Sequence, residues 1–344
     1  MRSFSIIIVS WNALHHLKTY LPSVLATRYS NFEVILADNA SSDGSKAWVR
    51  EQYPEVIIAE LDKNYGYCGG NNRAVPYASG DILLFLNNDV RVEPGWLNAL
   101  ADCFSDPRTA AAQPKFRSDK DPEYFEYAGA AGGYLDRYGY PFCRGRVFDT
   151  VEKDHGQYDD SKQVLWASGA ALAVRKELFN EQKGFDEDFE FHMEEIDLCW
   201  RLWNAGYRVC YCPGSIIYHL GGGSLPMGSP RKIYYNYRNN LTMLWKNYST
   251  QSLRKHFWIR YILDIIAALQ LMLTGKWAEC KAIVRAHYHF WRSFRATRQK
   301  RRRLLDNRKI EEDPPSLLSV NLVVEYFIKR KHTFDAIFPS RREQ

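Results

Sequence analysis

Cysteine pairs with CxxC spacing are missing from this sequence. Seven cysteines are scattered over 344 residues, and no two of them form a CxxC pair. An odd and scattered set does not match a disulfide framework or a zinc site, so we expect reduced thiols in a cytoplasmic protein. The first residues, MRSFSIIIVSWN, hold an apolar run that is too short for a signal peptide, and they contain no small-residue cleavage site.

Two common phosphate-binding motifs are also missing. The glycine-rich stretch reads Gly66-x-x-Gly69-Gly70 instead of GxGxxG, and the chain has no P-loop. This argues against a dehydrogenase-type dinucleotide fold and against a P-loop enzyme. The most apolar stretch, residues 257–273, is too short and too charged for a comfortable membrane span, because Arg260 and Asp264 interrupt it.

Acidic residues are scarce in the last third of the chain. Residues 228–344 contain 24 Lys and Arg against 9 Asp and Glu, whereas residues 1–227 contain 22 against 31. We therefore expect two regions: 1–227 as a catalytic domain, and 228–344 as a basic amphipathic helical region. Apolar and basic helix faces suit the anionic inner surface of the cytoplasmic membrane, with a homo-oligomer interface as the alternative.

The first hundred residues alternate between apolar strands and amphipathic helices. Strands are predicted at 5–10, 32–37, 56–60 and 82–86, with helices between them. This alternation indicates an α/β fold with a mostly parallel sheet and helices on both faces. Ligands bind beyond the carboxyl ends of such strands, where this chain places Asn12, Asp38, Asn64 and Asp89. Residues 164–175 read as one further strand, and 110–160 show no clear period.

Four groups of residues could carry chemistry. Asp89 could bind a divalent cation that holds a diphosphate, or could merely start a turn. Asp38 could contact a nucleobase or ribose, or form an Asx-turn. The carboxylates in Glu194-Glu195-Ile196-Asp197 could raise one another's pKa and tune a general base, or could only suit a helix N-terminus. His219 could be a second metal ligand or a structural histidine. The glycines after it favour a mobile loop that covers a bound ligand.

Taken in order, these stretches resemble glycosyltransferase family 2 with a GT-A fold. The matching stretches are SIIIVSWN, ILADNASSDGS, NYGYCGGNNRAV, GDILLFLNNDV, SGAALAVRKELF, GFDEDFEFHMEEIDLCWRLWNAGYRV and HLGGGS. Within this family they most resemble the bacterial rhamnosyltransferase-like branch, which builds cell-surface polysaccharide such as that of lipopolysaccharide and the cell wall.

The resemblance implies a role for each matched position. Glu195 falls where the family has its catalytic base, Glu194 precedes it, and Asp197 stays open as a rival. Asp89 and His219 are the implied ligands of Mg²⁺ or Mn²⁺. The implied acceptor residues are Trp166, Ser168 and Gly169. The implied donor residues are Val9, Ser10, Asn12, Asp38, Asn39, Asn64, Gly66, Gly70, Asn72, Asn87, Asn88 and Asp89.

Two departures from the family pattern matter. Asn87 stands where the DxD motif has its first Asp, so the metal has one anionic ligand fewer. Glu195 replaces the usual Asp and is one methylene longer.

The implied reaction is a metal-assisted, inverting displacement that moves rhamnose from dTDP-rhamnose to a glycan or lipid-linked acceptor. The alternatives are a UDP-sugar donor (galactofuranose, N-acetylglucosamine or glucose) and a sugar nucleotidyltransferase. A nucleic-acid-binding protein would need neither Asp89 nor the acidic cluster, so we expect no nucleic acid partner.

Overall fold

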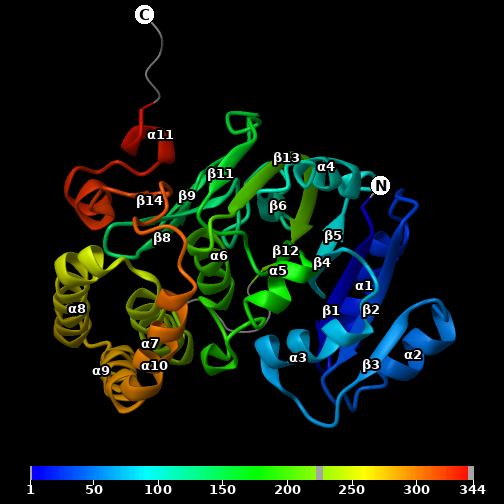
Figure 1. The fold of residues 1–344 in the computed structure, drawn as a ribbon, viewed down its shortest axis with the longest axis horizontal. Coiled ribbons are helices and arrows are strands. Elements are labelled where there is room, and N and C mark those ends of the chain that lie inside the picture. Colours follow the sequence, from blue (N-terminus) through cyan, green and yellow to red (C-terminus); the bar gives the residue numbers. More distant parts are fainter. Residues whose placement is uncertain (1, 222–227, 340–344) are drawn as a thin grey trace, which may run out of the picture.

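The computed structural model describes residues 2–221 and 228–339. Within them the largest element is a nine-stranded sheet in the order β11-β13-β6-β12-β4-β1-β2-β3, with β5 beside β13 (Figure 1). Its strands are β1 (Phe4–Ser10), β2 (Phe32–Asp38), β3 (Ile57–Glu60), β4 (Ile82–Asn87), β5 (Val90–Val92), β6 (Thr109–Ser118), β11 (Lys162–Val164), β12 (Ala171–Arg175) and β13 (Arg208–His219).

The half of this sheet that holds β1 to β4 is parallel. These strands are almost entirely apolar and are buried on both faces, as a sheet covered by helices requires. The register sets Ser10 of β1 beside Asp38 of β2, and Val9 beside Asn87 of β4. The polar residues that follow these strands therefore gather at one edge of the sheet.

The other half of the sheet is mixed. β12 runs antiparallel to β4 and β6, whereas β13 runs parallel to β6 and antiparallel to β5 and β11. The α/β prediction is confirmed, but the parallel arrangement does not extend through the whole sheet. The single strand predicted over 164–175 is wrong: β11 ends at Val164 and β12 begins at Ala171, with β13 and β6 between them.

The irregular middle of the chain forms most of a second, smaller sheet. Its order in the described residues is β10-β9-β8-β7-β14. The strands are β7 (Gly133–Asp136), β8 (Pro141–Cys143), β9 (Arg146–Val147), β10 (Thr150–Val151) and β14 (Leu317–Leu318). Because β14 comes from the C-terminal region and pairs with β7, the end of the chain returns to the first region.

Helices cover the large sheet and form a bundle beside it (Figure 1). Those of the first region are α1 (Leu14–Leu25), α2 (Ser45–Gln52), α3 (Gly66–Ala74), α4 (Trp96–Cys103), α5 (Lys176–Glu181) and α6 (Glu194–Asn204). Those of the second are α7 (Pro230–Asn247), α8 (Thr250–Leu273), α9 (Trp277–Arg292), α10 (Phe294–Asp306) and α11 (Phe334–Ile337). α7 packs on α6 and also on α8, α9 and α10, so it joins the two regions.

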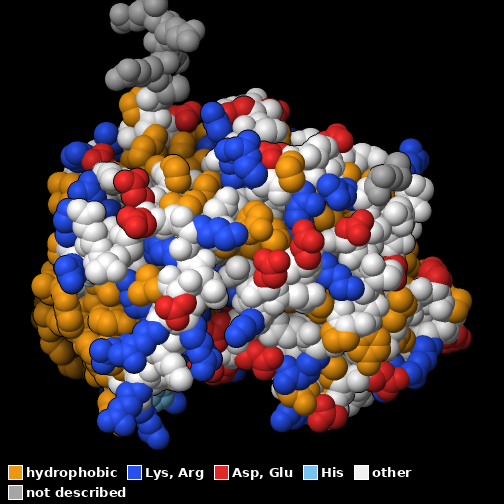
Figure 2. Space-filling view, in the orientation of Figure 1, with side chains coloured by type: hydrophobic (Ala, Val, Ile, Leu, Met, Phe, Trp, Pro, Cys, Tyr) orange, Lys and Arg blue, Asp and Glu red, His pale blue; other side chains and the backbone are white. Residues whose placement is uncertain are grey.

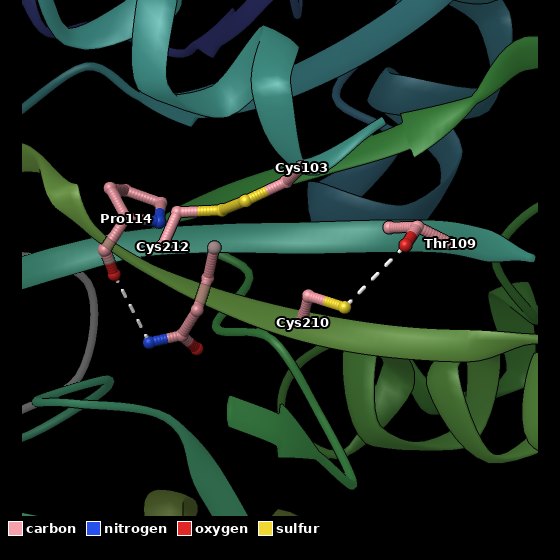
Figure 3. The surroundings of a disulfide bond; sticks show 6 residues. Cys103, Thr109, Pro114, Cys210 and Cys212 are labelled. Carbon is pink, nitrogen blue, oxygen red and sulfur yellow. Dashed lines mark hydrogen bonds between the residues drawn. A yellow bond between two sulfur atoms is a disulfide. The ribbon is translucent and has the colours of Figure 1, made fainter. Parts of the chain in front are cut away.

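The expectation that all seven thiols are reduced is wrong for two of them. Cys103 at the end of α4 and Cys212 on β13 form a disulfide across 109 residues of sequence (Figure 3). α4 packs on β13, and this contact brings the two cysteines together. Spacing could not reveal the pair, because only the helix-on-sheet packing makes them neighbours. The other five cysteines are free thiols.

Candidate active site

A cavity of about 820 Å³ lies at the carboxyl ends of β1, β2 and β4. Its volume is in the range of sites for small-molecule ligands. Eight residues predicted to bind the donor line it: Val9, Asn12, Asn39, Asn64, Gly66, Asn87, Asn88 and Asp89. Two of these amide side chains also hold the backbone of Gly66 in place. Asn39 donates to the Gly66 carbonyl at 3.0 Å, and Asn64 accepts from the Gly66 N–H at 2.8 Å.

Two further predicted donor residues are buried beneath this cavity. Ser10 accepts a hydrogen bond from the Asn88 side chain at 3.4 Å. The Asp38 carboxylate accepts from the Ser41 N–H at 3.3 Å through Oδ2, which is local turn chemistry. Its Oδ1 is buried without a hydrogen-bond partner among the described residues, so one acceptor of Asp38 is left for a ligand.

Gly70 and Asn72 shape the site from outside the cavity. A Cβ at Gly70 would lie 2.9 Å from Asn39 Nδ2 and 3.0 Å from Val9, so only glycine lets α3 pack this closely on the sheet. The Asn72 side chain donates to the Phe185 carbonyl and accepts from the Phe185 N–H, both at 2.9 Å. It thereby holds the loop that precedes α6.

The cavity also contains residues that the sequence reasoning missed. Trp11 follows β1 directly and is 55% exposed, and His16 lies in the first turn of α1. A tryptophan directly after the first predicted strand was a signal that could have been used. Arg231 enters the cavity from the first turn of α7, and only the packing of α7 could place it there.

Asp89 and His219 meet where this cavity adjoins a second one. The register of β13 against β5 sets His219 opposite Val90, one residue from Asp89. His219 Nε2 lies 3.2 Å from Asp89 Oδ1 and 3.4 Å from Asn87 Nδ2. The pairing of Asp89 with His219, predicted from positions 130 residues apart, is therefore present in the fold.

Glu126 is a third member of this group that the sequence reasoning missed. Its Oε2 lies 3.4 Å from His219 Nδ1, and all three side chains are buried. Burial alone would lower the pKa of His219, but the carboxylates of Glu126 and Asp89 outweigh it and raise this pKa to about 10. Burial opposes ionisation of Asp89, yet His219 lowers the pKa of Asp89. Glu126 falls in the stretch without a clear period, so no pattern marked it.

The second cavity has a volume of about 550 Å³ and is more apolar. It shares Tyr67, Asn87, Asp89 and Phe191 with the first cavity. The predicted acceptor residues Ser168 and Gly169 line it, together with Tyr124, Tyr127, His192 and Lys232. The two cavities thus meet at Asp89.

Trp166 does not reach this cavity. Its side chain is 2% exposed, and its indole donates to the Tyr134 carbonyl at 3.0 Å. Its ring also covers Gly133, where a Cβ would lie 2.1 Å from the indole. Trp166 therefore fills the core under the site and presents no face to an acceptor, contrary to the sequence-based expectation.

Glu194 and Glu195 both line the second cavity at the start of α6. Each has an Oε2 that is buried without a hydrogen-bond partner in the described residues. Burial raises the pKa of Glu195 to about 7, and burial with the neighbouring Glu195 charge raises the pKa of Glu194 well above its ordinary value. The Glu195 charge therefore raises the pKa of Glu194, as the crowding of carboxylates predicted, whereas the pKa of Glu195 rises through burial.

Asp197 has a different environment. It is fully buried and binds Arg201 Nε at 2.9 Å, Lys246 Nζ at 2.9 Å and Asn247 Nδ2 at 2.7 Å. These partners satisfy the carboxylate, and two of them lie on α7. Asp197 therefore joins α6 to α7, and these partners do not agree with its role as a rival base.

The fold is similar to that of several solved structures. Over 73% of this chain it is similar to GalNAc-T7, solved with UDP, GalNAc and Mn²⁺, at a TM-score of 0.58 and 16% identity, and covers 49% of that chain. Over 89% of this chain it is similar to the mannosyltransferase PcManGT from Pyrobaculum calidifontis, solved with GDP-Man and Mn²⁺. The TM-score is 0.52 and the identity 15%, and the likeness covers 86% of that chain. These likenesses show a GT-A fold.

Sequence comparison agrees with the resemblance. Residues 5–160 match the family model Glycosyl transferase family 2. Over these residues the chain is similar to this family, as the resemblance predicted. Its homologues include the N-acetylglucosaminyl-diphospho-decaprenol L-rhamnosyltransferase of Mycobacterium tuberculosis, at 27% identity over 88% of this chain and 98% of the relative. Rhamnosyltransferase WbbL of Escherichia coli is 28% identical over 51% of this chain and 72% of the relative.

Proposed function

We propose that this chain is an inverting glycosyltransferase that moves L-rhamnose from dTDP-rhamnose to a hydroxyl of a glycan or lipid-linked glycan in cell-surface polysaccharide synthesis. The rhamnosyltransferase homologues support the sugar. The observation that carries the chemistry is Glu195, a partly buried carboxylate with a pKa of about 7 on the wall of the second cavity. A base with this pKa is matched to deprotonating a hydroxyl near neutral pH.

Each cavity has one task in this reaction. The first holds the donor nucleotide and the second holds the acceptor. The Glu195 carboxylate accepts the proton of the acceptor hydroxyl while that oxygen bonds to the anomeric carbon. The bond from this carbon to the diphosphate breaks on the opposite side, so the configuration inverts and no covalent enzyme intermediate forms. Glu194, with its pKa raised further, stays protonated beside Glu195.

We also propose that Asp89 and His219 hold a divalent cation, Mg²⁺ or Mn²⁺. Among the described residues no group of three or more His, Cys, Asp or Glu side chains is arranged to hold a metal. Two protein ligands still fit, because such cations take further ligands from phosphate and water. Binding of the cation would require His219 to release the proton that the neighbouring carboxylates stabilise. Glu126 at the second nitrogen of His219 fits as the carboxylate that orients a ligating histidine. When bound, the cation neutralises the charge of the leaving diphosphate.

The place of the enzyme follows from its acceptor. We propose that residues 1–227 carry the reaction and that 228–344 hold the chain at the inner face of the cytoplasmic membrane, where a lipid-linked acceptor lies. Arg231 and Lys232 of the second region also contribute to the two cavities. A homo-oligomer through the same region is the other arrangement considered.

A donor screen tests this function. Calorimetry with dTDP-rhamnose, UDP-galactofuranose, UDP-N-acetylglucosamine and UDP-glucose, with and without Mn²⁺, measures binding, and NMR of the product measures its anomeric configuration. We expect dTDP-rhamnose to bind tightest and Asp89→Ala to lose the Mn²⁺ dependence, while Asp121→Ala, an exposed control, keeps it. Tighter binding of a UDP-sugar would refute the proposed donor. A product with retained configuration would refute the inverting mechanism. Unchanged Mn²⁺ dependence in Asp89→Ala would refute the proposed cation site.

A further inference from the structure

The outward face of α8 and α9 is apolar and exposed to solvent. On α8, Ile262, Ile266, Leu269 and Leu273 share one face, and their side chains are between 49% and 83% exposed. Trp258 near the start of α8 stacks on Trp291 near the end of α9, with ring centroids 6.2 Å apart. The two helices therefore run antiparallel, and their exposed residues form one continuous surface, which we call the α8–α9 face.

This face continues along α9. Trp277, Val284 and Tyr288 are 56% to 60% exposed and lie on one side of the helix. Figure 2 shows hydrophobic side chains gathered along the left edge of the molecule, where Figure 1 places α8. Contiguous exposed apolar surface of this kind marks a contact with a protein or a membrane, because leaving it in water is unfavourable.

The polar stripe of α8 points the other way, into the protein. Arg260 and Asp264 form a buried ion pair at 2.7 Å, and Asp264 also lies 3.3 Å from His287 of α9. Arg260 further donates to the Tyr138 carbonyl at 3.2 Å. A helix of an ordinary water-soluble bundle turns its apolar stripe inward, so α8 has the inverse arrangement.

α8 lies along the protein and does not project from it. By length and composition it is the one helix in the described part of the chain that could cross a membrane, and only 22% of its most apolar window is buried. Its Arg260–Asp264 side, however, packs on α9 and on the Tyr138 segment, and the helix also contacts α7. If α8 crossed a membrane, Arg260 and Asp264 would have to separate from these partners, which is costly in free energy.

The charge around the face has one sign. Residues 250–306, which span α8 to α10, contain thirteen Lys and Arg against three acidic residues, and Asp264 among these is buried. Lys281, Arg285 and Arg292 of α9 are exposed beside the apolar stripe. Two copies meeting through this face would bring like charges together, whereas an anionic lipid surface is complementary to it.

We propose that the α8–α9 face docks this protein onto an anionic lipid bilayer, with the apolar side chains of α8 and α9 entering the acyl boundary and the basic residues contacting lipid headgroups. Interfacial helices bind in this manner, through buried apolar area and attraction to anionic headgroups together. The docking deepens the membrane placement given above but needs neither the donor nor the acceptor assigned there.

The docked orientation brings the acceptor cavity close to the lipid. α7 packs on α8 and α9 with one side, and Arg238 and Asn239 of α7 hydrogen-bond to the carbonyl of Phe189 with the other. The segment that follows Phe189 supplies Phe191 and His192 to the second cavity. One helix therefore lies between the docking face and the segment that lines the acceptor site.

Vesicle co-sedimentation of the full chain tests the docking. The probes are phosphatidylcholine vesicles with and without phosphatidylglycerol. The variant is Ile262→Glu with Ile266→Glu, and the control is Ala47→Glu with Tyr77→Glu, which adds the same charge at exposed sites of the catalytic region. We expect the wild type and the control to bind anionic vesicles, salt to weaken this binding, and the variant to bind about tenfold or more weakly.

Two measurements keep the result interpretable. Nucleotide-sugar binding by calorimetry, unchanged in both variants, shows that they are folded and reports on the proposed function separately. The oligomeric state is measured by light scattering without lipid. Wild-type protein that ignores anionic vesicles, or a variant that binds them as well as the control does, would overturn the proposal. So would a wild-type dimer that the variant converts to a monomer, because the face would then join two copies.

Discussion

At the scale of single residues, the site depends on placing Glu195 where water does not reach one of its oxygens. A carboxylate on the surface is ionised at neutral pH and is a weak base. Here burial raises the pKa of Glu195 to about 7, against the stabilising backbone N–H groups at the start of α6. The same first turn of α6 that positions the base thus also limits how far its pKa rises.

Replacing Glu195 by Gln removes this base with little change in shape. We expect kcat to fall about 10²- to 10⁴-fold while the donor affinity is kept. In the wild type, kcat/KM should rise with pH through about 7, because the base must be ionised. Initial rates across pH, with donor binding by calorimetry, measure both effects, and a variant with wild-type rates would exclude Glu195 as the base.

The same substitution affects stability with a definite sign. The folded-state pKa of Glu195 is above its unfolded value, so the folded wild type loses stability as pH rises through about 7, whereas Gln does not titrate. We expect Glu195→Gln to unfold at a higher temperature than the wild type at about pH 8, and this gap to close towards about pH 5. Thermal unfolding at the two pH values measures it, and a gap independent of pH would contradict the pKa shift.

The candidate residues were predictable where they belong to a local pattern. Asp89 ends a strand, Glu194 and Glu195 start a helix, and His219 precedes a glycine stretch, so their neighbours in sequence identified them. Gly222 and the residues to 227 lie outside the described part of the chain, so the mobile loop stays a prediction. Glu126 and Arg231 follow no local pattern. They reach the site through the packing of distant segments, so the residues next to them in sequence do not indicate this placement.

At the scale of elements, the active site depends on the contact between α6 and α7. Lys246 of α7 lies within 3.0 Å of the buried carboxylate of Asp197 on α6, and it also pairs with Asp186 at 2.6 Å. Asn247 adds a hydrogen bond to Asp197. Because α6 begins with Glu194 and Glu195, this cluster fixes the helix that carries the proposed base.

Removing the α7 ammonium should weaken this contact measurably. Lys246→Met leaves buried carboxylates short of one partner, and we expect it to lower the free energy of unfolding by about 3 kcal/mol. Lys255→Met, at an exposed position of α8, should change it by less than about 0.5 kcal/mol. Denaturant unfolding of the three proteins measures the difference. Equal stabilities would show that the cluster does not hold α6 to α7.

Most element types were predictable because the periodicity of apolar residues is local. The four strands of the parallel half match their predicted bounds closely. The strand predicted over 164–175 failed because an apolar run can also be core filling between two strands, as Trp166 shows. The second sheet went unrecognised because its strands have two to four residues, which is too short for alternation to be visible.

At the scale of the whole molecule, the two regions form one folded unit. β14 pairs with β7, Leu322 is fully buried, and Phe334 packs against Tyr134 and Phe142. The C-terminal region therefore completes the core of the small sheet. The boundary proposed at 227 separates two compositions, but the hydrophobic core crosses it.

A truncated chain tests this unity. We expect residues 1–227 alone to be insoluble or to lack a cooperative thermal transition, because the truncation exposes Phe142 and leaves Asp197 without its α7 partners. A chain that ends at residue 339 serves as the control and should be soluble and unfold cooperatively. Soluble expression and circular dichroism on heating measure the outcome. A cooperatively folding 1–227 fragment would show that the catalytic domain is independent.

The sequence by itself determined the α/β fold, the family resemblance, the strand ends that carry the candidate site and the excess of basic charge after residue 227. These properties depend on the order of neighbouring residues, which periodicity and motifs report directly. Tertiary structure alone decided that Cys103 meets Cys212, that Glu126 faces His219, that Trp166 is core, and that α8 turns its apolar side outward. Each of these depends on which distant surfaces pack together, and a sequence pattern cannot tell an apolar stripe that faces the core from one that faces away.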